Sequence, residues 1–156
     1  MTAIYIDADA CPVRDEVYRV AERLSIEVFV VSNGSRPIRP SPNPIVHMVV
    51  VGEGADAADH WIAEHIGAGD ICVTGDIPLA SRCLAKDALA LAANGKIWTK
   101  DNIGNALAGR EVSRHLRELG MTGGGSAPFS KADRSRFLQA LDKLVQTAKA
   151  RLPNPR

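Results

Sequence analysis

The segment Ile45–Val51 constrains the fold of this chain more than any other, because six of its seven residues are apolar. A strand with apolar side chains on both faces is typical of a parallel sheet that helices cover on each side. Two similar runs precede it, at residues 3–7 and 26–31, and a segment with helical periodicity separates those two. This pattern predicts an α/β protein whose sheet is mainly parallel.

The rest of the chain continues the alternation. Further strands are expected at residues 70–74, 88–92 and 96–99, and helices at 12–24, 55–66, 78–86, 102–119 and 131–150. We expect Asn102 to cap the fourth helix, and Ser130 with Asp133 to form a capping box at the start of the last one. We therefore predict a three-layer α/β/α sandwich as a single domain over residues 1–150, followed by a flexible basic tail at 151–156.

The composition argues against several classes of protein. The formal net charge of +1 gives no general attraction for a polyanion, and no apolar run approaches the roughly 20 residues that span a bilayer. The N-terminal residues lack the pattern of a signal peptide. Cys11, Cys72 and Cys83 are an odd number without metal-ligand spacing, which is typical of free thiols in a reducing compartment. We expect a cytoplasmic protein without membrane association.

Five carboxylates are placed to meet at one edge of the predicted sheet. Asp7 and Asp9 come directly after the first strand, and Asp76 follows the fourth. Asp56 and Asp59 begin the helix after the third strand, and their spacing of three residues puts them on one helix face. The carboxyl ends of parallel strands meet at the same edge of a sheet, where α/β proteins build their sites. We therefore predict one acidic site.

Such a cluster calls for a cation. Carboxylates held close together repel one another unless a positive charge lies among them, and hard cations such as Mg²⁺ prefer oxygen ligands. Bound ions of this kind can activate a water molecule and stabilise the leaving oxygen of a phosphodiester. We predict a metal-dependent hydrolase, with all five acids catalytic and four of them metal ligands: Asp7, Asp56, Asp59 and Asp76.

Most of these acids have an alternative role at a helix start. Asp9 could cap the first helix, Asp56 could favour the N-terminus of the second, and Asp76 could cap the third. Asp7 is not placed as a cap at all, and this favours the metal interpretation of the group. Asp70, which begins its strand, should lie at the opposite edge of the sheet.

Two groups of basic residues could bind phosphates near this edge. They are Arg36 and Arg39 in a proline-rich loop, and Lys131, Arg134 and Arg136 after the glycine-rich stretch 122–126. Arginine binds phosphate with bidentate geometry, and backbone amides of a glycine loop can form an anion-binding nest. The alternative for each group is a solvated surface.

Two further residues near the predicted site could take part in chemistry. Cys11 precedes a helix start, where the helix dipole lowers the pKa of a thiol, but the dense carboxylates oppose a thiolate. We therefore expect a structural thiol. His60 could reach the edge of the site, although a solvated position on its helix is the favoured alternative.

Several motifs of this chain resemble a known family. They are Asp7–Val13, Ser32–Gly34, Gly54–Asp59, Gly75–Ala80 and Phe129–Arg134. Together they closely resemble the YaiI/YqxD family of bacterial proteins, over nearly the whole chain to about residue 150. The resemblance implies a PIN-like fold, since that family looks like a branch of the PIN-like nucleases, which cut RNA with acidic residues and magnesium or manganese.

The resemblance also implies roles for individual residues. By position, the acids of the PIN-like pattern correspond to Asp7, Asp56, Asp59 and Asp76, while Asp9 is additional. Asn33, in the second motif, is placed among the substrate-binding residues. The implied cofactor is Mg²⁺ or Mn²⁺ and the implied partner is nucleic acid, in the first place RNA.

Two other functions stay open at this point. In a phosphatase of the haloacid dehalogenase type, Asp7 would be the nucleophile of an Asp-x-Asp pair with Asp9 and would form an aspartyl-phosphate. Against this, the segment 75–81 lacks a second acid after Asp76. The other alternative is a non-catalytic RNA-binding module on the same fold. The sequence leaves the oligomeric state open.

Overall fold

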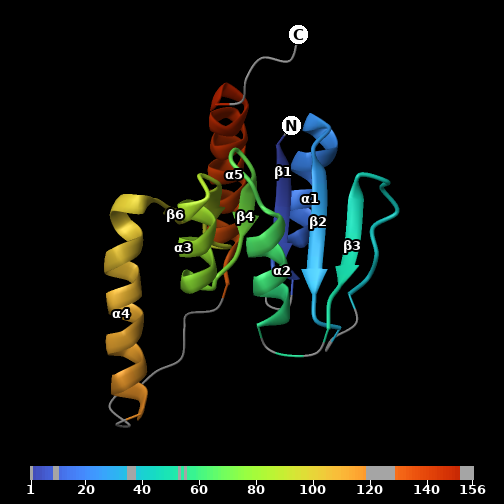
Figure 1. Ribbon diagram of the computed structural model, residues 1–156. Helices are drawn as coiled ribbons and strands as arrows, with labels where there is room; N and C mark the ends of the chain where they lie inside the picture. Colours follow the sequence, from blue (N-terminus) through green and yellow to red (C-terminus); the bar gives the residue numbers. More distant parts are fainter. Residues whose placement is uncertain are drawn as a thin grey trace.

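The computed structural model shows a twisted sheet with helices on both of its faces (Figure 1). It describes residues 2–8, 11–34, 38–52, 54, 56–118 and 129–151, apart from the side chains of 110–118 and 151. The strands are β1 (Ala3–Asp7), β2 (Glu27–Ser32), β3 (Val46–Val50), β4 (Ile71–Val73), β5 (Leu89–Leu91) and β6 (Ile97–Trp98). The helices are α1 (Arg14–Leu24), α2 (Ala57–His65), α3 (Ile77–Ala85), α4 (Lys100–Glu118) and α5 (Lys131–Arg151).

The strand order is β3-β2-β1-β4-β5-β6, with β1 to β5 parallel and β6 antiparallel to β5. One core cluster joins α1 and α5 to the sheet through side chains such as Val17, Phe137 and Ile6. A second joins α2 and α3 to the opposite face through Ile62 and Leu79. The predicted three-layer α/β/α architecture is therefore confirmed.

The strand order places a topological switch at the centre of the sheet. From β1 the chain passes through α1 to β2 and on to β3, and it then returns through α2 to β4 on the other side of β1. The loops after β1 and β4 consequently diverge at their carboxyl ends. In open α/β sheets this crevice is the usual position of a site.

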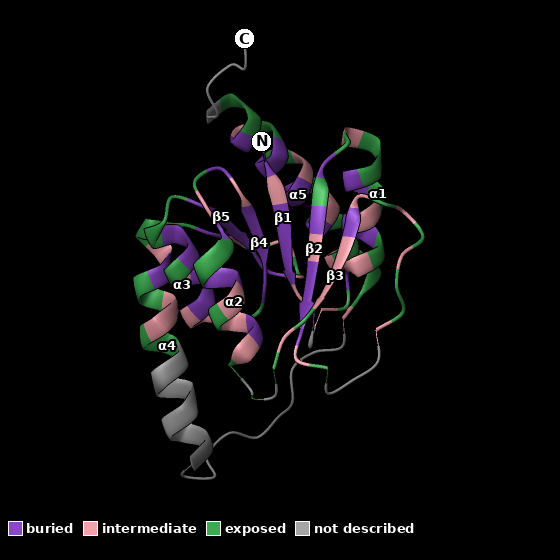
Figure 2. Cartoon of the chain, turned by 45° about the vertical axis from the view of Figure 1, so that its right-hand side comes forward, coloured by how far each residue is buried: buried purple, intermediate pink, exposed green. Residues whose placement is uncertain are grey.

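Strand β3 differs from the prediction that helices would cover both of its faces. It is an edge strand, its residues His47, Met48 and Val49 are only partly buried, and Val50 is 69% exposed. Figure 2 shows this difference between β3 and the central strands β1 and β4. The helices pack over the centre of the sheet, so burial here follows the position of the strand rather than its apolar composition.

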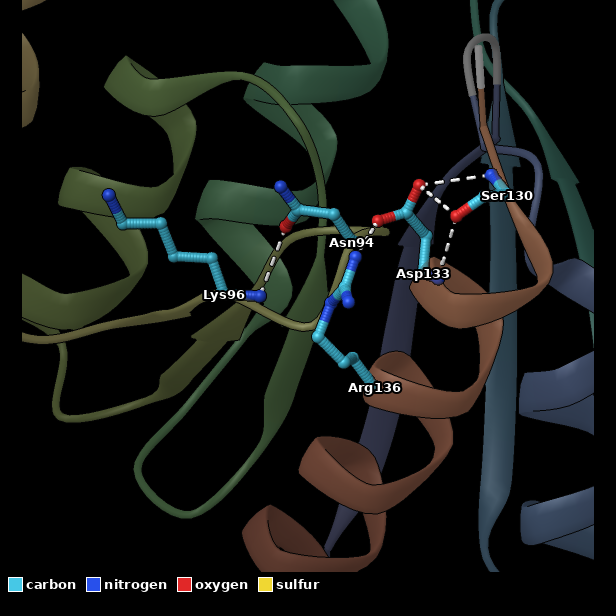
Figure 3. Close-up of polar contacts among 5 residues, drawn as sticks. All are labelled: Asn94, Lys96, Ser130, Asp133 and Arg136. Carbon is cyan, nitrogen blue, oxygen red and sulfur yellow. Dashed lines mark hydrogen bonds and ion pairs between the residues drawn. The ribbon is translucent and has the colours of Figure 1, made fainter. Parts of the chain in front are cut away.

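The starts of α4 and α5 show one wrong prediction and one confirmed prediction. Thr99 caps α4, because its Oγ1 accepts a hydrogen bond from Asn102 N at 3.1 Å, while Asn102 Oδ1 accepts one from Thr99 N at 2.9 Å. Asn102 is thus the third helical residue rather than the cap. At α5 the capping box is confirmed: Ser130 Oγ accepts from Asp133 N, and the Asp133 carboxylate accepts from Ser130 N (Figure 3).

The turn between β5 and β6 packs directly on α5. Gly95 has a φ of +92°, and a Cβ added there would lie 2.7 Å from the carbonyl carbon of Arg136. Asn94 and Lys96 flank this turn beside Arg136 (Figure 3). The contact joins the antiparallel end of the sheet to the helix that closes the fold.

Replacing Gly95 by alanine is therefore expected to lower the free energy of unfolding by about 2 kcal/mol or more, from the positive φ and the backbone clash together. Urea denaturation measures the change. Gly104→Ala in α4 is the matched control, because a Cβ there meets no atom within 4 Å and φ is not positive. Equal stability of the two variants would contradict the close contact.

Among the described residues, no helix combines the length and apolarity that a bilayer crossing requires. The three cysteines are free thiols, as predicted.

Candidate active site

The crevice at the topological switch is organised by Thr74, which directly follows β4. Its hydroxyl donates a hydrogen bond to Asp7 Oδ2 at 2.9 Å and accepts one from Asp76 N at 3.0 Å. Asp7 is the last residue of β1, the neighbour of β4 in the sheet. A buried threonine therefore connects the ends of the two central strands and holds the Asp7 carboxylate at their carboxyl edge.

Asp59 of α2 shows that the acids share one electrostatic environment. Burial, followed by the negative charges of Asp7, Asp76 and Asp56, raises the pKa of Asp59 to about 7. A hydrogen bond with Asp76 adds to the effect. The structure thus brings together Asp7 at the end of β1, Asp76 at the start of α3, and Asp56 and Asp59 at the start of α2. Asp70 lies at the opposite edge, as predicted, where it accepts hydrogen bonds from the amides at the start of β1 and in the preceding turn.

The capping roles considered for these acids are only partly observed. Asp76 is the N-cap of α3, and its Oδ1 accepts a hydrogen bond from Leu79 N at 2.9 Å. Asp56 occupies the N-cap position of α2, yet its side chain makes no capping hydrogen bond and is exposed. Val13 is the N-cap of α1, without a side-chain cap. Asp56 and Asp7 therefore have no role as caps.

The acids have the chemistry of a site for a hard cation. Burial first, and then the charges of three neighbouring carboxylates, raise the pKa of Asp59, and a divalent ion would relieve the part of this effect that is repulsion. In the described part of the chain, no three Asp, Glu, His or Cys side chains are close enough to coordinate one ion as they stand. The oxygen donors fit Mg²⁺ or Mn²⁺ in type, and coordination requires them to draw together.

A small cavity adjoins Asp7 at the ends of β1 and β4. Its volume is about 10 Å³ and its lining residues are Asp7, Cys11, Val73, Thr74, Gly75 and Ala93. This is space for roughly one water molecule beside the Asp7 carboxylate.

The thiol of Cys11 lines the same cavity. Burial is the main reason that its pKa rises to about 11, and the Val13 amide and Arg14 lower that pKa by smaller amounts. The thiol stays protonated, which agrees with the structural role predicted for it.

Comparison with known proteins decides the family. A family model described as "Uncharacterized BCR, YaiI/YqxD family" matches residues 5–147. The chain belongs to the YaiI/YqxD family. It is 56% identical over 153 residues to a UPF0178 protein of Paramagnetospirillum magneticum, covering 98% of this chain and 100% of the relative. A UPF0178 protein of Rhodospirillum rubrum is 55% identical over 146 residues, covering 94% and 97%. No solved structure matches the chain.

The basic and polar residues predicted to bind substrate have different surroundings in this YaiI/YqxD protein. Asn33 Nδ2 donates to Gly54 O at 3.2 Å, which joins the loop after β2 to the loop that leads to Asp56. Arg39 and Lys131 are exposed. Both cations lie at the surface, and the prediction that Asn33, Arg39 and Lys131 bind substrate stays a prediction.

Arg134 is engaged with α1. Its Nη1 donates to Glu16 Oε1 at 2.8 Å and to Pro12 O at 3.1 Å, and its guanidinium carbon lies 4.9 Å from the centre of the Phe129 ring. Glu16 is buried, so this ion pair holds the first turns of α1 and α5 together. The structure thus shows a structural role for Arg134, with 44% of its side chain exposed.

Several predicted residues lie outside the described part of the chain. They are Asp9, Arg36, the glycine-rich stretch 122–126 and the tail from 152 to 156. Two functional candidates were missed by reasoning from sequence. Thr74 follows β4 in the same motif as Asp76, which was a usable signal, whereas no sequence signal indicated that Arg82 of α3 contacts His60 of α2.

The raised pKa of Asp59 predicts a pH-dependent stability. Between about pH 4 and pH 7 the folded protein keeps a proton that the unfolded chain releases, so stability falls as the pH rises through this window. Asp59→Asn is therefore expected to raise the free energy of unfolding of the metal-free protein by about 1–2 kcal/mol at pH 8, allowing for solvent screening, and to change it little near pH 4.

Urea denaturation at the two pH values measures this difference. Glu22→Gln, an exposed position on α1, is the control for loss of one negative charge. The prediction fails if Asp59→Asn and Glu22→Gln show the same dependence on pH.

Proposed function

We propose that this protein is a nuclease that uses Mg²⁺ or Mn²⁺ to hydrolyse phosphodiester bonds in RNA. The observation that carries the proposal is the geometry at the topological switch, where the Thr74 hydroxyl hydrogen-bonds both the Asp7 carboxylate and the Asp76 amide at the ends of β1 and β4. Burial and the charges of Asp7, Asp76 and Asp56 also raise the pKa of Asp59, which supports it. Of the four acids, Asp76 makes the capping hydrogen bond at a helix start, and Asp56 makes none although it occupies the N-cap position of α2.

The roles of the residues follow from their contacts. Asp7, Asp56, Asp59 and Asp76 would hold the metal, which lowers the pKa of a bound water and stabilises charge on the leaving oxygen. Thr74 orients Asp7 by donating to its Oδ2, and the Leu79 amide orients Asp76. Burial and the neighbouring acids raise the pKa of Asp59 to about 7, so its carboxyl would have to give up any proton it holds in order to serve as a metal ligand.

RNA as the substrate, the cytoplasm as the compartment and membership of the PIN-like superfamily belong to this proposal. Support for the substrate and the superfamily is the resemblance between the placement of Asp7, Asp56, Asp59 and Asp76 and the acid pattern of PIN-like nucleases. Support for the compartment is the presence of three free cysteines. The order β3-β2-β1-β4-β5 puts the ends of β1 and β4, which lead to Asp7 and Asp76, next to one another, and Asp56 and Asp59 come from the start of α2.

The test is cleavage of a 5′-labelled single-stranded RNA by the purified protein with Mg²⁺, with Mn²⁺ and with excess chelator. We expect shortened products with either metal and none with chelator. A phosphoryl group trapped on Asp7 after incubation with a phosphomonoester would instead identify a phosphatase. RNA binding that chelator does not change, without any cleavage, would identify a non-catalytic module.

A further inference from the structure

The helices that carry three of the acids also bring an arginine and a histidine together. Helices α2 and α3 lie side by side on the same face of the sheet (Figure 1). Their N-cap residues are Asp56 and Asp76. One turn or more further along, Arg82 Nη1 of α3 lies 3.2 Å from His60 Nδ1 of α2, and both side chains are exposed.

The contact between Arg82 and His60 leaves most of the N–H groups of the two side chains available for other hydrogen bonds. An arginine that donates to Nδ1 of histidine leaves that ring with its N–H at Nε2, and the guanidinium has five N–H groups in all. Of the ion pairs formed within the described residues, none includes Arg82, whereas Arg23, Arg134 and Arg136 each pair with a carboxylate. Arg82 and His60 therefore present several donors and an unneutralised positive charge to solvent.

His60 lies one helical turn after Asp56, which places the Arg82–His60 pair beside the acids. His60 N donates to Asp56 O at 3.0 Å within α2, so the two residues are four apart and share a helix face. Side chains in this relation have Cβ atoms roughly 5–6 Å apart. A phosphate held by Arg82 and His60 would thus lie next to a phosphodiester at the acidic cluster, and its binding site would offset the negative field that repels a polyanion there.

We propose that Arg82 and His60 bind the backbone phosphate adjacent to the phosphodiester at the acidic cluster. The identity of the ligand as an RNA strand depends on the proposed function. Arginine suits this task because its planar donors match phosphate oxygens, and the contact with His60 fixes its orientation. The pair positions the strand and takes no part in the reaction at the cleaved bond.

The experiment is equilibrium binding of a fluorescein-labelled single-stranded RNA in Mg²⁺, over a series of KCl concentrations, to protein carrying Asp7→Asn so that the strand stays intact. Arg82→Ala is expected to weaken binding roughly tenfold and to reduce the slope of log affinity against log salt by about 0.7, the value for one phosphate contact on a single strand. We expect His60→Ala to weaken binding less, and Arg82→Lys to restore the slope.

Arg19→Ala is the matched control, since Arg19 is an exposed arginine on α1, across the sheet from α2. It should leave affinity and slope unchanged. With Asp7 intact, Arg82→Ala should raise KM for cleavage about tenfold and leave kcat within about twofold, because uniform binding is lost.

The outcomes separate this proposal from the nuclease. If Arg82→Ala binds RNA as Arg19→Ala does, the phosphate site is overturned even where cleavage is present. If the salt slope depends on Arg82 but no metal-dependent cleavage occurs, the phosphate site stands and the nuclease fails. If the unsubstituted protein binds no RNA, both are overturned.

Discussion

Replacing Asp7 by asparagine is expected to lower metal-dependent cleavage of RNA by roughly a hundredfold or more, because a ligand carboxylate is lost from the reacting centre. Asp7 ends the central strand β1 and accepts a hydrogen bond from Thr74 at 2.9 Å. Asparagine is nearly isosteric and can keep that acceptor. The fold should therefore be retained, and the metal-free protein should gain stability because repulsion with Asp59 is relieved.

Asp70→Asn is the control, and it should lower stability without lowering cleavage. Asp70 accepts hydrogen bonds from Ala3 N at 3.0 Å and Gly67 N at 2.9 Å, at the far edge of the sheet. Its replacement should lower the free energy of unfolding by about 1–2 kcal/mol and leave cleavage unchanged. Cleavage rates and thermal unfolding of both variants test the assignment. A sharp loss of metal-free stability in Asp7→Asn would move Asp7 to a structural role.

Replacing Phe137 by alanine is expected to lower the free energy of unfolding by about 3–5 kcal/mol, the largest stability effect that we predict. Phe137 is fully buried and belongs to the core cluster that joins α5 to α1 and the sheet. The deletion removes apolar contacts and leaves a cavity in a close-packed layer. For a chain of this size the melting temperature should fall by roughly 10 °C.

Leu138→Ala is the matched control on the same helix. Leu138 is only partly buried at the margin of the same cluster, so its loss leaves no enclosed cavity. We expect about 1 kcal/mol or less for this variant. Thermal and urea unfolding distinguish the two. Similar losses at the two positions would contradict the central place of Phe137 in the core.

The acids illustrate what could be predicted from sequence. Asp7 and Asp76 follow strand-like runs and lie at the carboxyl edge of the sheet, as this order predicts. Asp70 precedes such a run and lies at the opposite edge, also as predicted. The capping box of Ser130 and Asp133 was equally predictable, because its hydrogen bonds connect residues three apart. In each case local sequence order determines the geometry.

Other contacts depend on segments far apart in the chain. Arg134 pairs with Glu16, which lies 118 residues earlier, a contact that the sequence did not indicate; the prediction that Arg134 binds phosphate stays a prediction. Arg82 and His60 meet because α2 and α3 pack side by side, and no sequence pattern around either residue indicates this contact. The predicted start of α4 was also wrong. Thr99 is the cap, and a reciprocal pair of hydrogen bonds joins it to Asn102.

The sequence by itself determined that strands and helices alternate and which strand ends carry acids, because the hydrophobic periodicity and the direction of each strand are local properties. Only the tertiary structure decided the order of the strands. That order placed the apolar strand β3 at an exposed edge and brought the ends of β1 and β4 together around Thr74. The physical reason is that strand order depends on how helices pack over both faces of the sheet, which involves contacts between segments distant in sequence.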